Sequence, residues 1–333
     1  MTTEDTSPYT AGERPYKIFM DGFLASFAHP RTKHQADHRL IEQGSVIYGG
    51  EHYVDEPFLI SAPDGAWMST LTIASAQEGD HSQRIVSLRS TDMGQTWSKP
   101  VDIESADGPE VSKAVPLLTD FGRIYAFYFF NLDDIREIIG DDPPYETKIC
   151  KRVDSLGTLC FRYSDDGGRT WSATRYEIPV REFDVDTENP YHGSVKFGMV
   201  SAVPAVANGV VYLPVTKVGR FGEGLFARSE GVVIASSNLM TERNPLLLDW
   251  LTLPGGRVGL RPPGGGGLIS EEHSITALSD GTLQNTFRTV AGWPAVSYSV
   301  DNGSTWTEPT YMTYADGRRV KCPRAANFVW KCR

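Results

Sequence analysis

Cysteine is scarce in this sequence. The four cysteines fall as two pairs, Cys150 with Cys160 and Cys322 with Cys332, and neither spacing matches the close CxxC pairs of zinc sites. We therefore predict buried free thiols and no metal site. A disulfide in either pair would instead indicate a secreted protein, because disulfides persist in oxidising compartments.

Long apolar runs are missing altogether. No stretch approaches the roughly 20 apolar residues that span a bilayer, and residues 1–17 are polar rather than signal-like. We expect no membrane span. As written, the chain is expected in the cytosol, and an incomplete reading frame would leave an extracellular location open.

Basic residues are fewer than acidic residues. Lys and Arg number 32 against 42 Asp and Glu, which gives a formal net charge of −10, and no local run of Lys and Arg compensates. Phosphate backbones select the opposite balance, so we expect no nucleic-acid partner. The 333 residues, 40% of them hydrophobic, suffice for a large core in one domain.

What the sequence does contain is a repeated octapeptide, S-x-D-x-G-x-T-W, at residues 90–97, 164–171 and 299–306. Its short polar side chains can bond their own turn backbone, and its glycine can supply a positive φ. Each copy follows an alternating or apolar strand, so each is predicted to be a hairpin turn whose tryptophan is largely buried. The structural positions of the three copies are Ser90, Asp92, Gly94, Trp97, Ser164, Asp166, Gly168, Trp171, Ser299, Asp301, Gly303 and Trp306.

A second repeated feature precedes each octapeptide. It consists of an apolar strand, a tight Asp/Asn-Gly turn and an aromatic-rich strand, first seen at residues 58–73. It recurs at residues 114–130, 203–215 and 275–287, although the third unit has only a degenerate octapeptide at 236–250. Each unit is thus four strands long, which is the size of a propeller blade.

The octapeptide resembles the Asp-box of the sialidase or BNR-repeat superfamily, which contains glycosidases, lyases and non-enzymatic binders. The resemblance implies an all-β fold, a sialidase-like β-propeller, over residues 45–333 after an N-terminal segment at 1–44. Four blades account for roughly residues 56–310, and a fifth inner strand is predicted to begin at 325–330. Complete propellers of this kind would have six or seven blades, so we expect an open, C-terminally incomplete wheel, or else closure by residues 17–50.

Candidate site residues follow from propeller geometry, in which inner strands line the axis. Residues just before each inner strand, and at the far end of the second strand, should meet at one mouth. Before the inner strands stand His52, Asp55, Glu56, Lys113, Tyr191, His192, Lys196, Glu271, Glu272, His273 and Arg324. After the second strands stand Asp80, His81, Arg84, Tyr128, Lys217 and Arg288.

From these we select two groups by chemistry. The predicted catalytic residues are His52, His81, Tyr128 and His192. The predicted substrate-binding residues are Lys113, Lys196, Lys217, Glu272, Arg288 and Arg324. Several cations near one axis would be costly without an anion, so the expected ligand is a carboxylate-bearing sugar of an acidic glycan. Taken singly, each cation is as readily explained by a salt bridge, and each histidine by a merely exposed position.

No cofactor is expected. The acidic stretch at 133–142 lacks the ligand spacing of an EF-hand, so we predict a solvated loop, with structural calcium as the alternative.

Three functions remain open. Residues 160–168, 271–272, 287–289 and 314–318 resemble propellers related to rhamnose-glucuronate lyases, which implies elimination next to a uronate by a His, Tyr or Arg base. An exo-sialidase would need an arginine cluster, a Tyr nucleophile activated by Glu, and an Asp acid/base. Sialidases commonly carry an early Arg-Ile-Pro-like motif, which residues 29–32 do not match. The third alternative is a non-catalytic glycan-binding or inactive truncated propeller.

Overall fold

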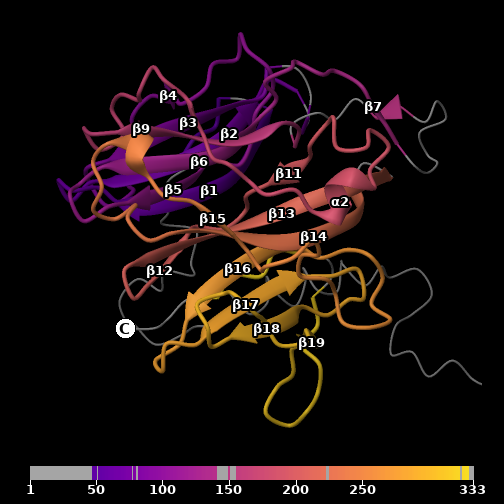
Figure 1. The fold of residues 1–333 in the computed structure, drawn as a ribbon. Helices are drawn as coiled ribbons and strands as arrows, with labels where there is room; N and C mark the ends of the chain where they lie inside the picture. The colour runs from indigo at the N-terminus through magenta and orange to yellow at the C-terminus, as the bar shows by residue number, and fades with distance from the viewer. Residues whose placement is uncertain are drawn as a thin grey trace, which may run out of the picture. The chain divides into compact units, whose positions relative to one another are not determined.

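The computed structural model describes residues 47–50, 52–76, 78–79, 82–140, 149–150, 155–222, 225–322 and 325–329. The chain divides into two units, Met1–Val46 and Ile47–Arg333, and all described residues belong to the second. Within that unit nearly all regular structure is antiparallel sheet, arranged as successive propeller blades (Figure 1). The fold is a sialidase-like β-propeller, as the repeats predicted.

Four blades follow one another along the chain. Blade 1 contains β1 (Tyr53–Ser61), β2 (Trp67–Ala74), β3 (Arg84–Ser90) and β4 (Val101–Asp102). Blade 2 contains β5 (Val115–Leu118), β6 (Ile124–Phe130), β9 (Thr158–Ser164) and β10 (Tyr176–Glu177). Blade 3 contains β11 (Gly198–Met199), β12 (Ala205–Ala207), β13 (Val210–Gly222), β14 (Leu225–Ser236) and β15 (Leu251–Leu253). Blade 4 contains β16 (Glu271–Ala277), β17 (Leu283–Arg288), β18 (Ala295–Ser299) and β19 (Thr310–Tyr311).

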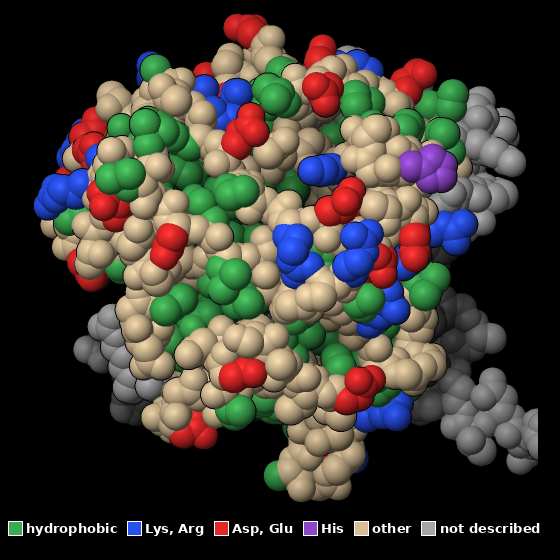
Figure 2. Space-filling model, viewed as in Figure 1, with side chains coloured by type: hydrophobic (Ala, Val, Ile, Leu, Met, Phe, Trp, Pro, Cys, Tyr) green, Lys and Arg blue, Asp and Glu red, His purple; other side chains and the backbone are tan. Residues whose placement is uncertain are grey.

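Smaller elements lie in the connections. The hairpin β7 (Ile138–Ile139) and β8 (Ile149–Cys150) is inserted in blade 2. The short helices are α2 (Asp184–Thr187) and η2 (Pro245–Leu247). Among the described residues no helix is long and apolar enough to cross a membrane. On the face shown in Figure 2, Lys and Arg side chains are interspersed with Asp and Glu.

Period-two burial explains why the blades stack. In β6, Tyr125 and Phe127 pack toward blade 3, whereas Ala126 and Tyr128 pack toward blade 1. Successive side chains of a strand point to opposite faces, so a strand enclosed between two blades must be apolar or aromatic on both. This is why the sequence of β6 reads as a continuous aromatic run.

The predicted octapeptides form hairpin turns between the third and fourth strands of blades 1, 2 and 4. In the first copy the Ser90 hydroxyl donates to Asp92 Oδ1 at 2.7 Å and accepts from the Gly94 N–H at 2.8 Å. The Asp92 carboxylate also accepts from the backbone N–H and hydroxyl of Thr96 at 2.9 and 2.6 Å. The other two copies repeat these four bonds to within 0.1 Å.

The three box tryptophans are of intermediate exposure and pack against the core clusters, so most of each residue is buried, as predicted. They lie at the hairpins between the third and fourth strands of their blades. Trp171 illustrates the contact, because its indole N–H donates to the Ser87 hydroxyl of blade 1 at 2.9 Å. The same hydroxyl bonds the Gly168 carbonyl at 3.0 Å, so this box ties two blades together.

The degenerate box of blade 3 rebuilds the same turn from distant residues. The Ser236 hydroxyl donates to Asp249 Oδ1 at 2.9 Å and accepts from the Leu239 N–H at 3.1 Å. Asp249 also accepts from the Ser237 N–H at 2.8 Å. In this box the aspartate follows the serine by 13 residues, whereas in the three regular octapeptides it follows by two. It nevertheless occupies the same position in the hydrogen-bond network.

Replacing Asp249 with alanine is expected to lower the free energy of unfolding by about 1–3 kcal/mol, because several hydrogen-bond donors lose their acceptor. Asp301→Ala, the same substitution in a regular octapeptide, should have an effect of the same size. Denaturant unfolding followed by tryptophan fluorescence measures the effect. Asp107→Ala, at an exposed loop position, is the control and should change stability by less than about 0.5 kcal/mol. Equal stability of the Asp249 and Asp107 variants would show that the degenerate box is not equivalent.

The predicted fifth inner strand and the predicted free thiols have different outcomes. Residues 325–329 form no strand, so the predicted fifth inner strand is wrong for these residues. The segment instead attaches to blade 4, where the Val329 carbonyl accepts from the Thr276 hydroxyl at 2.5 Å.

Cys160 and Cys322 are buried free thiols, as predicted, whereas the side chains of Cys150 and Cys332 lie outside the described residues.

Candidate functional site

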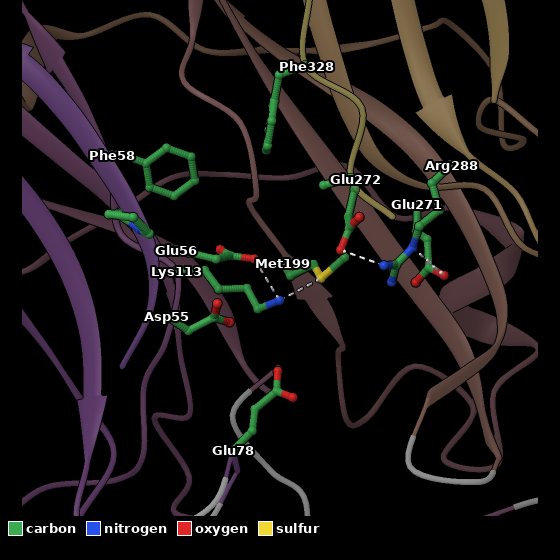
Figure 3. A pocket seen from close by; sticks show the side chains of 12 residues that line it. Asp55, Glu56, Phe58, Glu78, Lys113, Met199, Glu271, Glu272, Arg288 and Phe328 are labelled. Carbon is green, nitrogen blue, oxygen red and sulfur yellow. Dashed lines mark hydrogen bonds and ion pairs between the residues drawn. The ribbon is translucent and has the colours of Figure 1, made fainter. Parts of the chain in front are cut away.

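The inner strands of the blades converge on a pocket of about 560 Å³ (Figure 3). It is lined by Asp55, Glu56, Pro57, Phe58, Glu78, Lys113, Met199, Glu271, Glu272, Arg288, Ala326 and Phe328. All four blades contribute to this lining. Its volume falls in the range of small-molecule sites, and its lining combines aromatic and charged side chains.

An unusual backbone conformation recurs at the start of three inner strands. Glu56, Lys113 and Glu272 have φ values of 47°, 63° and 53°, in the left-handed region that non-glycine residues rarely adopt. β-Bulges interrupt β1 and β16 at these points. Bulges redirect side chains, and strain of this kind clusters at functional sites, so the three charged residues are candidates for function.

Hydrogen bonds between neighbouring blades hold two of these residues in place. The Lys113 N–H donates to the Thr72 hydroxyl of blade 1 at 2.9 Å. In the same way, the Glu272 N–H donates to the Thr216 hydroxyl of blade 3 at 3.1 Å. A threonine of one blade, in β2 or in β13, therefore positions the charged residue of the next blade.

Both cations of the described lining are paired with glutamates. Lys113 Nζ lies 3.1 Å from Glu56 Oε1, and Arg288 lies between two carboxylates. Its Nε is 3.2 Å from Glu271 Oε1 and its Nη1 is 3.1 Å from Glu272 Oε1. These side chains are largely buried, so the pairs offset the cost of removing each charge from water.

Glu56 has a perturbed proton equilibrium. Burial raises the pKa of Glu56 from its ordinary 4.5 to about 7, although the neighbouring Lys113 ammonium acts in the opposite direction. Its Oε2 atom is buried and makes no hydrogen bond with any residue that the structure describes. Near neutral pH Glu56 therefore occurs both as a carboxylate paired with Lys113 and as a neutral acid that can donate a proton to a bound ligand.

The raised pKa of Glu56 predicts a dependence of stability on pH. The folded state holds this proton more tightly than the unfolded chain, so the stabilisation is complete below about pH 4.5 and is lost as the pH rises through about 7. Relative to Glu56→Gln, the free energy of unfolding of the wild type should fall across this window by up to about 3 kcal/mol. Denaturant unfolding of both proteins at several pH values tests this, and parallel curves would contradict it.

Three of the predicted site residues line the pocket, namely Lys113, Glu272 and Arg288. Two others, His81 and Arg324, lie outside the described residues.

The remaining predicted residues lie elsewhere. His52, His192 and Lys196 are exposed and do not line the pocket. Tyr128 is fully buried between blades 1 and 2, where its hydroxyl donates to Glu104 Oε1 at 2.6 Å. Lys217 is buried and forms an ion pair with Asp186.

Sequence reasoning placed Asp55, Glu56 and Glu271 at the mouth but preferred histidine and tyrosine as catalytic groups. It missed Glu78, which lies in the loop after β2, and Phe58 at the first bulge. The acidic pair Asp55-Glu56, immediately before Pro57, was the feature of the sequence that could have identified Glu56 as a functional residue. Within the described ranges, no group of three or more His, Cys, Asp or Glu side chains is arranged to hold a metal ion.

Comparison with known proteins supports the fold. The BNR/Asp-box repeat family matches residues 162–173, which contain the second octapeptide. No curated protein matches the sequence at a significant level. Among solved structures, a protein of unknown function from Dyadobacter fermentans is similar, with 17% identity and a TM-score of 0.57 over 81% of this chain and 72% of that one.

Two sialidases are also similar in structure. Hadza microbial sialidase Hz136 has 17% identity and a TM-score of 0.54, covering 83% of this chain and 49% of its own. The NanB sialidase of Streptococcus pneumoniae has 12% identity and a TM-score of 0.54, covering 85% and 56%. The chain thus spans about half the length of these two proteins. At such identities the likeness shows the fold, and the expected resemblance to rhamnose-glucuronate lyases stays a prediction.

Proposed function

We propose that the pocket binds a sugar and hydrolyses its glycosidic bond, with Glu56 as the general acid. The observation that carries this proposal is the position of Glu56, a largely buried side chain in the lining of the pocket whose Oε2 makes no hydrogen bond with a described residue. Burial raises its pKa to about 7, which suits a proton donor. Most glycoside hydrolases use a carboxylic acid with a raised pKa to protonate the leaving oxygen. The sialidase-like fold and the Asp-box match support a carbohydrate as the substrate.

The second carboxylate of the proposed reaction is Glu272. It lies on the side of the pocket facing Glu56 in Figure 3, and the two are close enough for the charge of one to affect the pKa of the other. Arg288 lies 3.1 Å from its Oε1 and so places a cation beside it. An ionised Glu272 would act as nucleophile or as the base that activates water, while Glu56 donates the proton.

Elimination next to a uronate, which the sequence favoured, is the second candidate. Lys113 and Arg288 support it, because a lyase needs cations beside the uronate carboxylate. The residues that the sequence suggested as the base do not support elimination, because His52, His192 and Tyr128 do not line the pocket. Of the predicted bases only His81 remains, and it lies outside the described residues.

One experiment separates hydrolysis from elimination. The full chain is incubated with neutral oligosaccharides, rhamnosyl-glucuronate glycans and sialyl-lactose, while new reducing ends and the ultraviolet absorbance of unsaturated uronates are followed in parallel. Hydrolysis produces reducing ends without the absorbance, and elimination produces both. Binding of glycans without either signal would identify a non-catalytic glycan-binding propeller and overturn the proposal.

A further inference from the structure

We infer that His273 is a positioning residue, which fixes the backbone bulge that aims the Glu272 carboxylate into the pocket. This inference rests on the proposed function, because Glu272 is the second carboxylate of the proposed reaction. His273 directly follows Glu272 in β16, is 2% exposed and does not line the pocket. It therefore acts on a bound sugar only through its neighbours.

The bulge lies where β16 reaches the pocket. Glu271 pairs with Arg288 across the two strands. The next pair is Ser274 with Thr286, so two residues of β16 stand opposite one residue of β17. A bulge of this kind bends its strand and redirects a side chain. In Figure 3 the Glu272 side chain extends toward Arg288, and its Oε1 lies 3.1 Å from Nη1 of that arginine.

The bulge gives Glu272 a backbone conformation that needs support. Its φ of 53° lies in the left-handed region, which residues other than glycine rarely adopt. Such a conformation persists only where the surrounding structure determines it. The Thr216 hydroxyl supplies one contact, because it accepts from the Glu272 N–H at 3.1 Å. The His273 side chain supplies a second set of contacts.

Three partners hold the His273 ring. Its Nε2 lies 3.1 Å from Ser270 Oγ, and its Nδ1 lies 2.9 Å from Asn285 Nδ2. The ring also stacks on Phe287, with the ring centroids 4.6 Å apart and an angle of 24° between the planes. Ser270 immediately precedes β16, whereas Asn285 and Phe287 belong to β17. The imidazole therefore joins the start of β16 to the strand opposite the bulge.

The backbone of blade 3 also fits this ring. A Cβ atom at Gly231 of β14 would collide with Cε1 of His273, so the close approach requires glycine. Gly231 pairs with Thr216, the residue that accepts from the Glu272 N–H. One pair of positions in blade 3 thus contacts both residues of the bulge, the glycine through His273 and the threonine through Glu272.

The protonation state of the ring suits a positioning role. Complete burial lowers the pKa of His273 from 6.5 to about 4, although hydrogen bonds with Ser270 and Asn285 act in the opposite direction. The imidazole is therefore neutral near pH 7 and has one donor and one acceptor nitrogen. Because the amide nitrogen of Asn285 can only donate, Nδ1 accepts and Nε2 donates to the Ser270 hydroxyl.

The test removes the hydrogen bonds of His273 and keeps a ring in its place. The full chain is assayed for new reducing ends on whichever glycan the wild type cleaves among neutral oligosaccharides, rhamnosyl-glucuronate glycans and sialyl-lactose. In His273→Phe, kcat should fall by about 10²-fold, the cost of misplacing a reacting group by about 1 Å. KM should change little, because the lost interaction belongs to the transition state. Gly231→Ala should act in the same way, because the added methyl group displaces the ring.

A control separates positioning from a general loss of stability. Ser87→Ala also removes two buried hydrogen bonds between blades, one to the Gly168 carbonyl and one from the Trp171 indole, at residues that do not line the pocket. It should lower the free energy of unfolding by a similar amount and leave kcat unchanged. His273→Gln, whose amide can still bond the Ser270 hydroxyl, should recover most of kcat.

The outcomes separate this inference from the proposed function. Wild-type kcat in folded His273→Phe, or a loss no larger than that of Ser87→Ala, overturns the inference and leaves the proposed function intact. Gly231→Ala keeps the histidine itself, so the same comparison decides the question if His273→Phe does not fold. If the wild type cleaves none of the glycans, or cleaves them by elimination, the proposed function and the inference are overturned together.

Discussion

Replacing Glu56 with glutamine is expected to lower kcat for glycoside cleavage by about 10²–10⁴-fold, the range typical of a lost general acid. Glutamine keeps the shape of the side chain and an oxygen for Lys113, so glycan binding should persist. The protonated form of Glu56 is the active one, and its pKa is about 7, so wild-type activity should fall as the pH rises through neutrality. The variant should lose this limb of the profile.

The measurement is kcat and KM as a function of pH on a substrate identified by the glycan screen. Glu177→Gln, at an exposed position on β10, removes the same chemical group far from the pocket and should leave both constants unchanged. A Glu56→Gln variant that retains wild-type kcat, or retains the basic limb of the profile, would exclude Glu56 as the acid. A change in KM alone would assign it to binding instead.

Replacing Lys217 with methionine is expected to destabilise the protein by about 3–5 kcal/mol, because it leaves a buried carboxylate without its partner. The Lys217 and Asp186 side chains are 6% and 1% exposed, and the two form an ion pair. Burial also lowers the pKa of Lys217, which agrees with a structural position. The free energy of unfolding from denaturant titration measures the loss.

A second substitution makes this prediction specific. In D186N/K217M both charges are gone, and the amide that replaces the Asp186 carboxylate still offers an oxygen to the Phe183 N–H, which donates to Asp186 at 2.9 Å in the wild type. Most of the stability should therefore return. Equal loss in the single and double variants would show that packing rather than charge is responsible. Weakened glycan binding at unchanged stability would restore the substrate-binding role that the sequence predicted for Lys217.

Much of the fold could be predicted from local patterns. The three octapeptides form their turns where the sequence placed them, because each hydrogen-bond network is complete within eight residues. The Asp/Asn-Gly turns are likewise local, with Gly65 and Gly209 at φ values of 81° and 78°. Repetition then identified the blades, since a four-stranded unit can bury its faces only against neighbours of the same kind.

The site was predicted only in part. Lys113, Glu272 and Arg288, which were chosen by their position relative to the inner strands, line one pocket, because propeller topology directs those points of every blade toward the axis. Their role in binding stays a prediction. The same rule failed for Lys217, since β13 runs on to Gly222 and leaves this residue in the middle of a strand. It failed for Tyr128 because strand alternation turns its side chain toward blade 1.

The amino-acid sequence by itself therefore determined the strands, the turns and the blade repeat, all of which depend on contacts between residues near one another in the chain. Only the tertiary structure decided which charges meet. Glu56 and Lys113 are separated by 57 positions, and their pairing, burial and shared proton equilibrium depend on the packing of one blade against the next. A pKa depends on desolvation and on neighbouring charge, and neither exists until the blades assemble.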